Sequence, residues 1–167
     1  MAERNQGPVG VLTISDKASQ GKREDESGEA AVRILEEAGF SVVKKGVVPD
    51  NRQQIADTLA DWVDRERMAL IVTSGGTGLS PTDVTPQAMA EIIDYQVPGM
   101  AEAMRAASLK KTPHAMISRA LAGVRGSCLI LNLPGSPGGV EDNLNIVLPA
   151  LKHALAKLGG DTTDCAV

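Results

Sequence analysis

Short apolar runs rich in β-branched residues alternate along the chain with segments whose apolar residues recur at helical spacing. The apolar runs predict strands over residues 8–15, 40–48, 69–73, 120–124 and 128–133. The helical spacing predicts helices over residues 28–38, 51–67, 86–93, 99–109 and 138–158. Residues 16–27 are polar and predict a loop, and residues 159–167 predict a frayed tail.

Glycine and proline mark several of the expected boundaries. Gly39 suits the position just after a helix, and Gly126 suits a tight turn between the last two strands. Thr85 is expected to cap a helix whose first residue is Pro86, and Pro149 is expected to bend the last helix.

Strands alternating with helices predict an α/β fold with a mostly parallel central sheet and helices on both faces. The chain carries no internal repeat and no low-complexity linker, so residues 1–167 are expected to form a single domain with a core over about residues 8–158.

Composition narrows the range of partners. The net charge of −4 and the aromatic content of 2% argue against a nucleic-acid partner, which calls for a basic surface and stacking rings. Cys128 and Cys165 show neither CxxC spacing nor nearby histidines, so neither a disulfide framework nor a zinc site is expected. The N-terminus has no apolar signal core and no apolar run has the length of a membrane span, which predicts a cytoplasmic protein without membrane contact.

Polar and glycine-rich segments follow the predicted strands. These segments are Ser15-Asp16, Pro49-Asp50, residues 74–83 and residues 134–139. In a parallel sheet, ligands bind outside the carboxyl ends of the strands, so hydroxyls, glycines and carboxylates are expected to gather at one edge as a binding site.

The stretch TSGGTGLSPTDVTP, residues 73–86, carries three glycines in four positions and no lysine or arginine. Its amides can form an anion-binding nest without a lysine. It lacks the GxxxxGK[ST] pattern of a Walker loop, and Pro81 stands where a dinucleotide fingerprint needs glycine. The alternative is a glycine turn that holds no ligand.

A second glycine-rich segment, Pro134-Gly-Ser-Pro-Gly-Gly139, follows the last strand. Ser136 can cap the final helix, whose N-terminal amides and dipole also suit an anion. A capped helix start without a ligand is the alternative for this segment too. Together the two loops suggest a ligand with more than one anionic group, or a phosphate joined to a polar ring.

Two aspartates stand beside these loops. Asp83 precedes the expected cap Thr85, so capping does not occupy its carboxylate. Asp50 has a structural alternative, because it could cap the second helix in a capping box with Gln53. If both carboxylates face the anion loops, a divalent cation would remove their repulsion from a phosphate, and Mg²⁺ commonly binds one or two carboxylates plus substrate phosphates.

Other candidate sites are weaker. His114 and His153 lack metal-ligand spacing, and no GxSxG motif supports a serine hydrolase. Arg105 and the pair Ser118-Arg119 could reach a substrate, although surface arginines are common.

In their order along the chain, several motifs resemble those of the molybdopterin adenylyltransferases of MogA/MoaB type, which include the gephyrin G domain. The motifs are Thr13-Ile-Ser-Asp16, Val48-Pro-Asp50, Thr73-Ser-Gly-Gly-Thr-Gly78, Asp83-Val-Thr-Pro86, Pro98-Gly99, Ser118-Arg119 and Leu131-Asn-Leu-Pro-Gly135. The resemblance covers about residues 8–158, and GGTG followed by DVTP at this spacing is highly specific.

The resemblance implies a three-layer sandwich that usually assembles as a homotrimer and acts late in molybdenum cofactor biosynthesis. As nucleotidyltransferases, such proteins transfer AMP from Mg-ATP to molybdopterin and release pyrophosphate. Contact with a molybdenum-insertion protein is a further expectation.

The family's two essential aspartates fall on Asp50 and Asp83, which are expected to be catalytic and to hold Mg²⁺. The residues expected to bind ATP and molybdopterin are Thr13, Ser15, Ser74, Gly75, Gly76, Thr77, Gly78, Ser108, Ser118, Pro134, Gly135, Ser136, Gly138 and Gly139.

Thr82 departs from the resemblance, because many relatives carry arginine just before the aspartate. This departure leaves room for an alternative, a molybdopterin-binding or scaffold protein of the same pathway that does not adenylylate. The presence of both Asp50 and Asp83 favours the enzyme. An unrelated nucleotide-binding domain fits the expected fold but not the order of the motifs.

Overall fold

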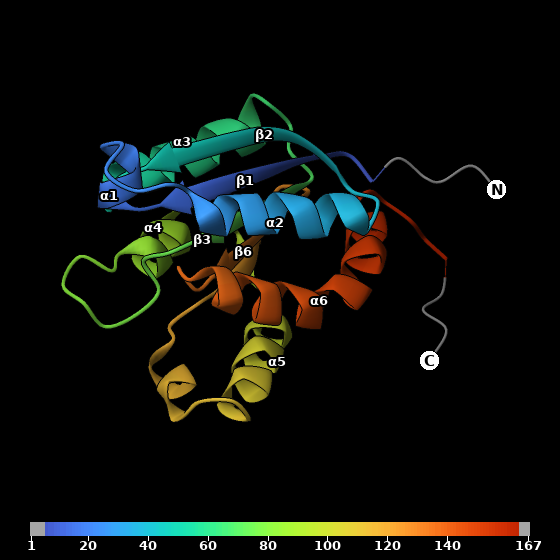
Figure 1. The fold of residues 1–167 in the computed structure, drawn as a ribbon. Coiled ribbons are helices and arrows are strands. Elements are labelled where there is room, and N and C mark those ends of the chain that lie inside the picture. The colour runs from blue at the N-terminus through green and yellow to red at the C-terminus, as the bar shows by residue number, and fades with distance from the viewer. Residues whose placement is uncertain (1–5, 164–167) are drawn as a thin grey trace.

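A computed structural model describes residues 6–163 and shows a central sheet between two layers of helices (Figure 1). The strands are β1 (Pro8–Ile14), β2 (Ser41–Val48), β3 (Leu70–Ser74), β4 (Tyr95–Gln96), β5 (Ala122–Arg125) and β6 (Cys128–Leu133). The helices are α1 (Asp16–Ser19), α2 (Glu26–Glu37), α3 (Arg52–Asp64), α4 (Thr85–Ile92), α5 (Pro98–Leu109), the short 3₁₀ helix η1 (Pro113–Ile117) and α6 (Pro137–Leu158).

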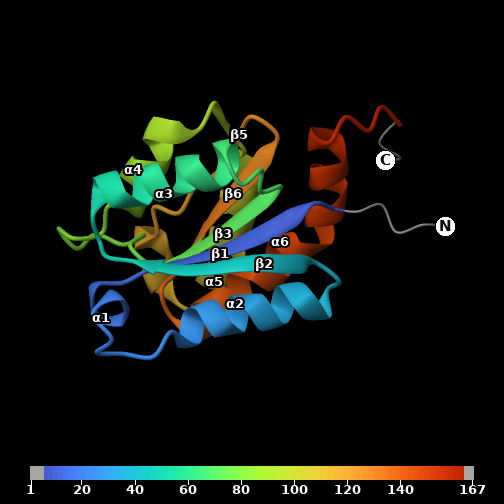
Figure 2. The same cartoon turned by 90° about the horizontal axis from the view of Figure 1, so that it is seen from above.

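The six strands lie in the order β2-β1-β3-β6-β5-β4. The first four are parallel to one another, whereas β5 and β4 add an antiparallel edge. Helices α2, α5 and α6 cover one face, and α3 and α4 cover the other (Figure 2). The expected mostly parallel sheet and three-layer sandwich are therefore confirmed.

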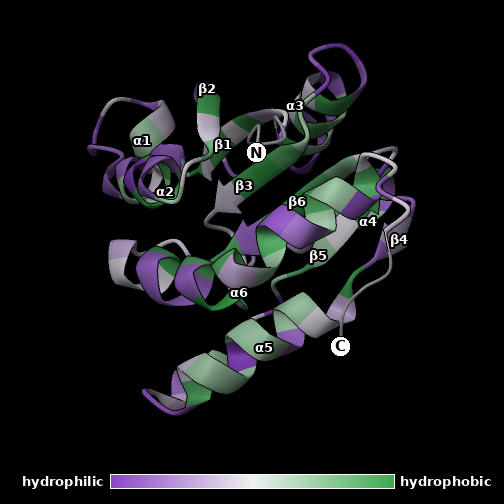
Figure 3. Cartoon of the chain, turned by 90° about the vertical axis from the view of Figure 1, so that its right-hand side faces the viewer, coloured by the Kyte–Doolittle hydropathy of each residue, from purple (hydrophilic) through white to green (hydrophobic). Residues whose placement is uncertain are grey.

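Apolar side chains alternate between the two faces of the strands. In β1, Val11 joins the cluster under α2, α5 and α6, and its neighbour Leu12 joins the cluster under α3 and α4. Figure 3 shows the hydrophobic colour on β3, between the helical layers. Trp62 of α3 lies over Gly10 and Gly46, where a β-carbon at Gly10 would come within 2.8 Å of the ring. The two glycines thus make room for the chain's one tryptophan.

Helix ends follow local chemistry, with some differences from the sequence-based expectations. Gly39 follows α2 with φ of +85°, as expected for a residue after a helix end. The segment expected to be an open loop, residues 16–27, instead holds α1 and the start of α2, whose N-cap is Asp25. The side chains of Ser15 and Asp25 accept the capping hydrogen bonds of α1 and α2. These caps allow helices to begin within a polar segment.

The expected cap at Thr85 is wrong, and so is the alternative that Asp50 caps a helix. Thr85 lies inside α4 rather than capping it, and its hydroxyl donates to the carbonyl of Gly75 at 3.0 Å. The cap of α3 is Asn51, whose Oδ1 accepts from the amide of Gln54 at 2.9 Å. Asp50 is therefore not the cap of α3, which removes the structural alternative for its carboxylate.

The expected hairpin turn at Arg125-Gly126 is confirmed, with Gly126 at φ of +56°. Strand β4 and η1 were not expected from the sequence, because each is only a few residues long and has no clear apolar periodicity.

Pro149 lies within α6, and Figure 1 shows the last turns of this helix running in a different direction from its first turns. No helix among residues 6–163 has the length and apolar character needed to cross a bilayer. Cys165 lies outside the described residues.

Candidate active site

The sheet order brings the loops after β1, β2, β3 and β6 to one edge. Strand β1 lies between β2 and β3, so the chain leaves β1 toward one side and returns from β2 to the other. Such a switch point opens a crevice at the carboxyl ends of the strands. The glycine loop, residues 75–84, begins at this point.

Backbone geometry requires glycine in this loop. Gly75 has φ of +102° and Gly76 has φ of +65°, in the left-handed region that favours glycine. A β-carbon at Gly75 would overlap the carbonyl oxygen of Ile14, and one at Gly76 would overlap the hydroxyl of Thr85. The amide of Gly75 donates to the carbonyl of Leu133 at 3.0 Å. The loop is thus tightly joined to the ends of its neighbouring strands.

The two glycine-rich segments contact each other. A β-carbon at Gly135 would lie 3.2 Å from the α-carbon of Gly75. The hydroxyl of Ser27, at the start of α2, donates to the carbonyl of Gly135 at 2.6 Å. The sequence-based expectation that both loops share one edge is therefore met in the structure.

Asp50 and Asp83 both lie beside the glycine loop. Oδ1 of Asp50 is 3.4 Å from the place of a β-carbon at Gly76, and Oδ2 of Asp83 is 2.8 Å from that place at Gly78. Oδ2 of Asp83 also accepts from the amide of Ser80 at 2.9 Å. The two aspartates, 33 positions apart in the chain, therefore flank the same few loop residues.

Asp16 is a third carboxylate at this edge, which was not among the expected site residues. Its amide donates to Oδ2 of Asp50 at 3.0 Å, and its own Oδ1 accepts from the amide of Asp50 at 2.9 Å. Burial raises the pKa of the Asp50 carboxyl, and the negative charges of Asp16 and Asp83 raise it further, against the lowering effect of the Asp16 amide. The position of Asp16 directly after β1 was the available sequence signal.

The donors at this edge fit a hard divalent cation. Asp50 and Asp83 offer carboxylate oxygens, and a bound cation would relieve the repulsion that raises the pKa of Asp50. Across residues 6–163, no group of three or more histidine, cysteine, aspartate or glutamate side chains forms a metal site by itself. The pair therefore suits an ion such as Mg²⁺ that completes its shell with waters and substrate phosphates.

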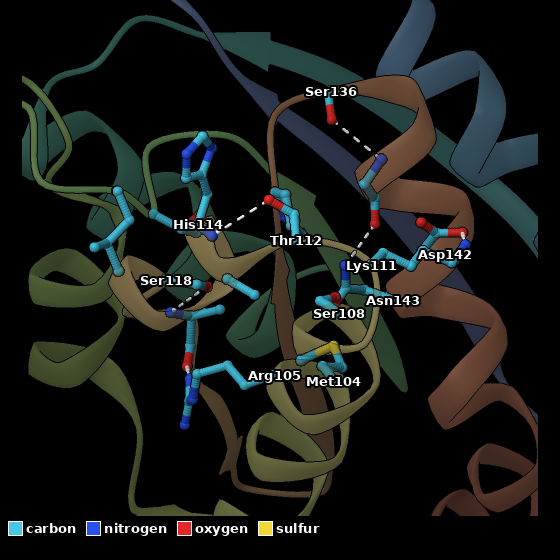
Figure 4. Close-up of a pocket in the computed structure, with 17 residues that line it drawn as sticks. Met104, Arg105, Ser108, Lys111, Thr112, His114, Ser118, Ser136, Asp142 and Asn143 are labelled. Atoms are coloured by element: carbon cyan, nitrogen blue, oxygen red, sulfur yellow. Dashed lines mark hydrogen bonds and ion pairs between the residues drawn. The ribbon is translucent and has the colours of Figure 1, made fainter.

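A cavity of about 380 Å³ is lined in part by Thr77 and Gly78 of the glycine loop (Figure 4). Its walls come from α5, η1, the segment after η1, and the start of α6. The expected site residues that line it are Thr77, Gly78, Ser108, Ser118, Pro134, Ser136 and Gly139.

The other expected site residues have different surroundings. Thr13 and Ser74 are buried, and the Ser74 hydroxyl donates to Oγ1 of Thr13 at 3.4 Å. Ser15 caps α1, and Gly138 lies in the first turn of α6 with open space around it. Gly75, Gly76 and Gly135 form the contact between the loops described above.

The cavity also holds basic and amide side chains. Arg105 was expected to be able to reach a substrate, whereas Lys111, His114 and Asn143 were not assigned to a site. Figure 4 shows Arg105, Lys111, His114 and Asn143 among the lining residues. Arg105 donates to the carbonyl of Ala120 at 2.8 Å, and Lys111 pairs with Asp142 at 2.5 Å. Positions 104, 105 and 108 follow one face of α5, so that spacing was a signal for the α5 wall, whereas Lys111 lies just beyond the end of the helix.

This arrangement forms two adjoining regions. The cavity offers the guanidinium of Arg105, the ammonium of Lys111 beside Asp142, and several hydroxyls, which suits an anionic ligand rich in hydrogen-bonding groups. Across Thr77 and Gly78, the glycine loop and its carboxylates suit phosphate groups bound with a cation.

Comparisons with known proteins agree with this geometry. A family model described as "Probable molybdopterin binding domain" matches residues 10–153. Molybdopterin adenylyltransferase of Helicobacter pylori strain J99 is 38% identical over 155 residues, which cover 92% of this chain and 88% of that protein. Gephyrin of Dictyostelium discoideum is 41% identical over 157 residues, which cover 88% of this chain but only 22% of gephyrin.

Solved structures give the same result. The molybdopterin biosynthesis enzyme MoaB of Thermus thermophilus superposes with a TM-score of 0.88 at 49% identity, covering 93% of this chain and 98% of that chain. The resemblance seen in the motifs is thereby confirmed. The chain belongs to the molybdopterin adenylyltransferase family of MogA/MoaB type.

Proposed function

We propose that this chain catalyses the transfer of AMP from Mg-ATP to molybdopterin in molybdenum cofactor biosynthesis, releasing pyrophosphate. The observation that carries the proposal is the placing of Asp50 and Asp83 against a lysine-free glycine loop that borders a basic cavity. Relatives named molybdopterin adenylyltransferase, at 35–38% identity over most of this chain, support it.

In the proposed reaction, a terminal phosphate oxygen of molybdopterin attacks the α-phosphorus of ATP. A new P–O bond forms to that oxygen, the bond between the α-phosphorus and the bridging oxygen to the β-phosphate breaks, and pyrophosphate leaves with the bond's electrons. Such a transfer depends mainly on positioning and charge stabilisation rather than on covalent chemistry by the protein.

The residues divide this task between them. Arg105, Lys111 and the hydroxyls of the cavity would bind and orient molybdopterin, and the amides around Gly76 and Gly78 would hold ATP phosphates. Asp50 and Asp83 would hold Mg²⁺ beside those phosphates. The ion, when bound, would neutralise the phosphate charge.

The test is pyrophosphate release by the purified protein with Mg-ATP and freshly prepared molybdopterin. We expect pterin-dependent pyrophosphate together with an AMP-pterin product. Asp83→Asn should lower the rate by about 10²–10³-fold, the usual effect of removing one electrostatic stabiliser, and should leave the Kd for molybdopterin nearly unchanged.

Asp57→Asn is the matched control, because Asp57 is exposed on α3 and lies outside the site. It should leave the rate unchanged. Unchanged turnover in Asp83→Asn would refute the role of this carboxylate. Tight molybdopterin binding without pyrophosphate in the wild type would favour the binding or scaffold alternative and direct attention to Thr82, which is exposed beside the aspartate.

The homotrimer implied by the family resemblance is part of this proposal. Light scattering on the purified protein should then give a mass three times the 17.4 kDa of one chain. A mass of one chain at micromolar concentration would remove the trimer from the proposal.

A further inference from the structure

Arg119 makes three hydrogen bonds to the glycine loop from a distant part of the chain. Its backbone amide donates to the carbonyl of Thr77 at 2.8 Å. Its Nε donates to the carbonyl of Gly78 at 2.8 Å, and one terminal guanidinium nitrogen donates to the carbonyl of Asp83 at 2.7 Å. The side chain thus joins the two ends of the segment between Gly78 and Asp83.

This segment needs such support, because its middle residues are exposed. Leu79 is 62% exposed, and Ser80, Pro81 and Thr82 are also exposed. Within the segment, the amide of Asp83 donates to the carbonyl of Ser80 at 2.9 Å, a short local turn. A turn of this kind fixes local shape but does not fix where the turn lies relative to the cavity.

Arg119 supplies that second constraint. The bonds from its guanidinium are charge-assisted and roughly twice as strong as neutral ones, and the planar fork fixes their mutual direction. They hold the main chain on both sides of the Asp83 carboxylate, which in turn lies against Gly78. The neighbouring residue, Ser118, lines the cavity. Arg119 therefore connects the cavity wall with the carboxylate side of the glycine loop.

We propose that Arg119 is a positioning residue for AMP transfer, which sets the place of Asp83 and of the loop amides through main-chain carbonyls and does not contact the substrates. This inference rests on the proposed function for its effect on turnover. Its effect on the loop does not depend on that function. The competing role is direct contact between the guanidinium and a substrate phosphate.

Hydrogen–deuterium exchange of residues 78–85 measures the loop directly. In Arg119→Met, without substrates, we expect exchange of this segment to be at least tenfold faster than in the wild type. Arg119→Lys should fall between the two, because an ammonium can keep one of the bonds but not the planar pair.

Steady-state kinetics measures the consequence for turnover. Arg119→Met should lower kcat by about 10–100-fold, in line with the effect of small misplacements on catalysis, and should change the Kd for molybdopterin less than threefold. Asp83→Asn should also lower kcat but leave exchange of the loop nearly unchanged, because the asparagine oxygen can still accept from the amide of Ser80. This comparison separates loss of the carboxylate charge from loss of its position.

Arg125→Met is the matched control. Arg125 also donates to a backbone carbonyl, that of Ile92 at 2.7 Å, and pairs with Asp64 far from the glycine loop. This variant should lose stability without faster exchange in residues 78–85. If Arg119→Met does not fold, shown by circular dichroism, Arg119→Lys carries the same comparison.

Two outcomes would overturn the inference. The first is unchanged exchange of residues 78–85 in both Arg119 variants, whatever their activity. The second is a raised KM for ATP with unchanged kcat, the result expected of a direct substrate contact. A wild type that releases no pyrophosphate would refute the proposed function instead, while the exchange measurement would still decide whether Arg119 holds the loop.

Discussion

Asp50 lies in surroundings that disfavour its charged form. It is partly buried, and the carboxylates of Asp16 and Asp83 lie near it. The hydrogen bond from the Asp16 amide offsets only part of this effect, so the pKa of Asp50 is raised. Carboxylates with perturbed pKa values are common at functional sites. A cation bound beside Asp50 would stabilise its charged form more than a cation beside an exposed aspartate.

The raised pKa of Asp50 gives a prediction for stability. Between the ordinary aspartate pKa of about 3.9 and the raised native pKa, the native state holds more protons at this residue than the unfolded state, so stability falls as pH rises. We expect Asp50→Asn to raise Tm at pH 7 without Mg²⁺, and the difference from the wild type to vanish below the ordinary aspartate pKa. Calorimetry over that pH range measures it, with Asp57→Asn as control. A lower Tm at pH 7 would mean that the hydrogen bond from Asp16 outweighs burial and repulsion.

Gly75 and Gly138 allow a comparison of two glycines that the sequence pattern treats alike. Gly75→Ala places a methyl group against the Ile14 carbonyl at a positive φ, whereas the space around Gly138 is open. Strain and overpacking at Gly75 should together cost about 2–5 kcal/mol of unfolding free energy, and Gly138→Ala should change it by about 0.5 kcal/mol or less. Urea unfolding provides both values. Equal effects would show that the close contact with Ile14 does not constrain the loop.

At the scale of helices and strands, the residue that caps a helix differs from its neighbour at the candidate site. Asn51 caps α3, and this leaves the neighbouring Asp50 side chain directed to the amide of Asp16. Similarly, Thr85 is used to fix Gly75, and α4 begins without a side-chain cap. Asp50 and Thr85 thus form hydrogen bonds at the candidate site rather than capping α3 and α4.

Substitution of Asn51 tests this division. Asn51→Ala should lower the unfolding free energy by about 1 kcal/mol, and Asn51→Asp should restore most of it, because aspartate caps as well as asparagine. Denaturant unfolding at pH 7 measures the change. An unchanged unfolding free energy in Asn51→Ala would show that Asn51 is not the cap of α3.

Elements with clear apolar patterns were predictable, whereas α1, β4 and η1 were not. The strands that form the parallel part of the sheet and the helices α2, α3, α5 and α6 follow from periodicity, with ends shifted by a few residues. Strand β4 is two exposed residues that pair with β5, so its structure depends on the partner strand and not on its own sequence. Helix α1 depends on the cap from Ser15.

At the scale of the whole molecule, two apolar clusters share one sheet. Adjacent residues of β1, Val11 and Leu12, belong to opposite clusters, and Ile71 and Val72 of β3 do the same. Loss of either helical layer would therefore expose the face of these strands that the layer covers. This shared use of the strands joins the two clusters into one cooperative unit.

Unfolding should therefore occur in a single transition. Fluorescence of Trp62, which lies in the cluster under α3 and α4, should follow the same urea curve as far-ultraviolet circular dichroism, which reports all helices. The calorimetric enthalpy should equal the van't Hoff enthalpy, at a protein concentration kept constant because assembly would make Tm concentration-dependent. Two separate curves would show that the helical layers unfold independently.

The candidate site was only partly predictable. The glycine loops, Asp50, Asp83 and the hydroxyls Ser108, Ser118 and Ser136 were identified from strand ends and family motifs. The basic wall formed by Lys111 and His114 was not, because it comes from a helix end and η1, which lie beyond the strand ends that the sheet rule indicates. Arg119 was identified as a residue that could reach a substrate, whereas the structure shows it bound to loop carbonyls.

The amino-acid sequence by itself determined the alternation of strands and helices, the positions of the glycine loops and the aspartates that follow strands. These are local properties, set by apolar periodicity and by the positive φ that only glycine accepts easily. The tertiary structure decided which of these residues meet. Asp16 and Asp50 are 34 positions apart, and Arg119 and Gly78 are 41 apart. Such contacts depend on strand order and on the packing of α5, η1 and α6 over the sheet, which no local pattern encodes.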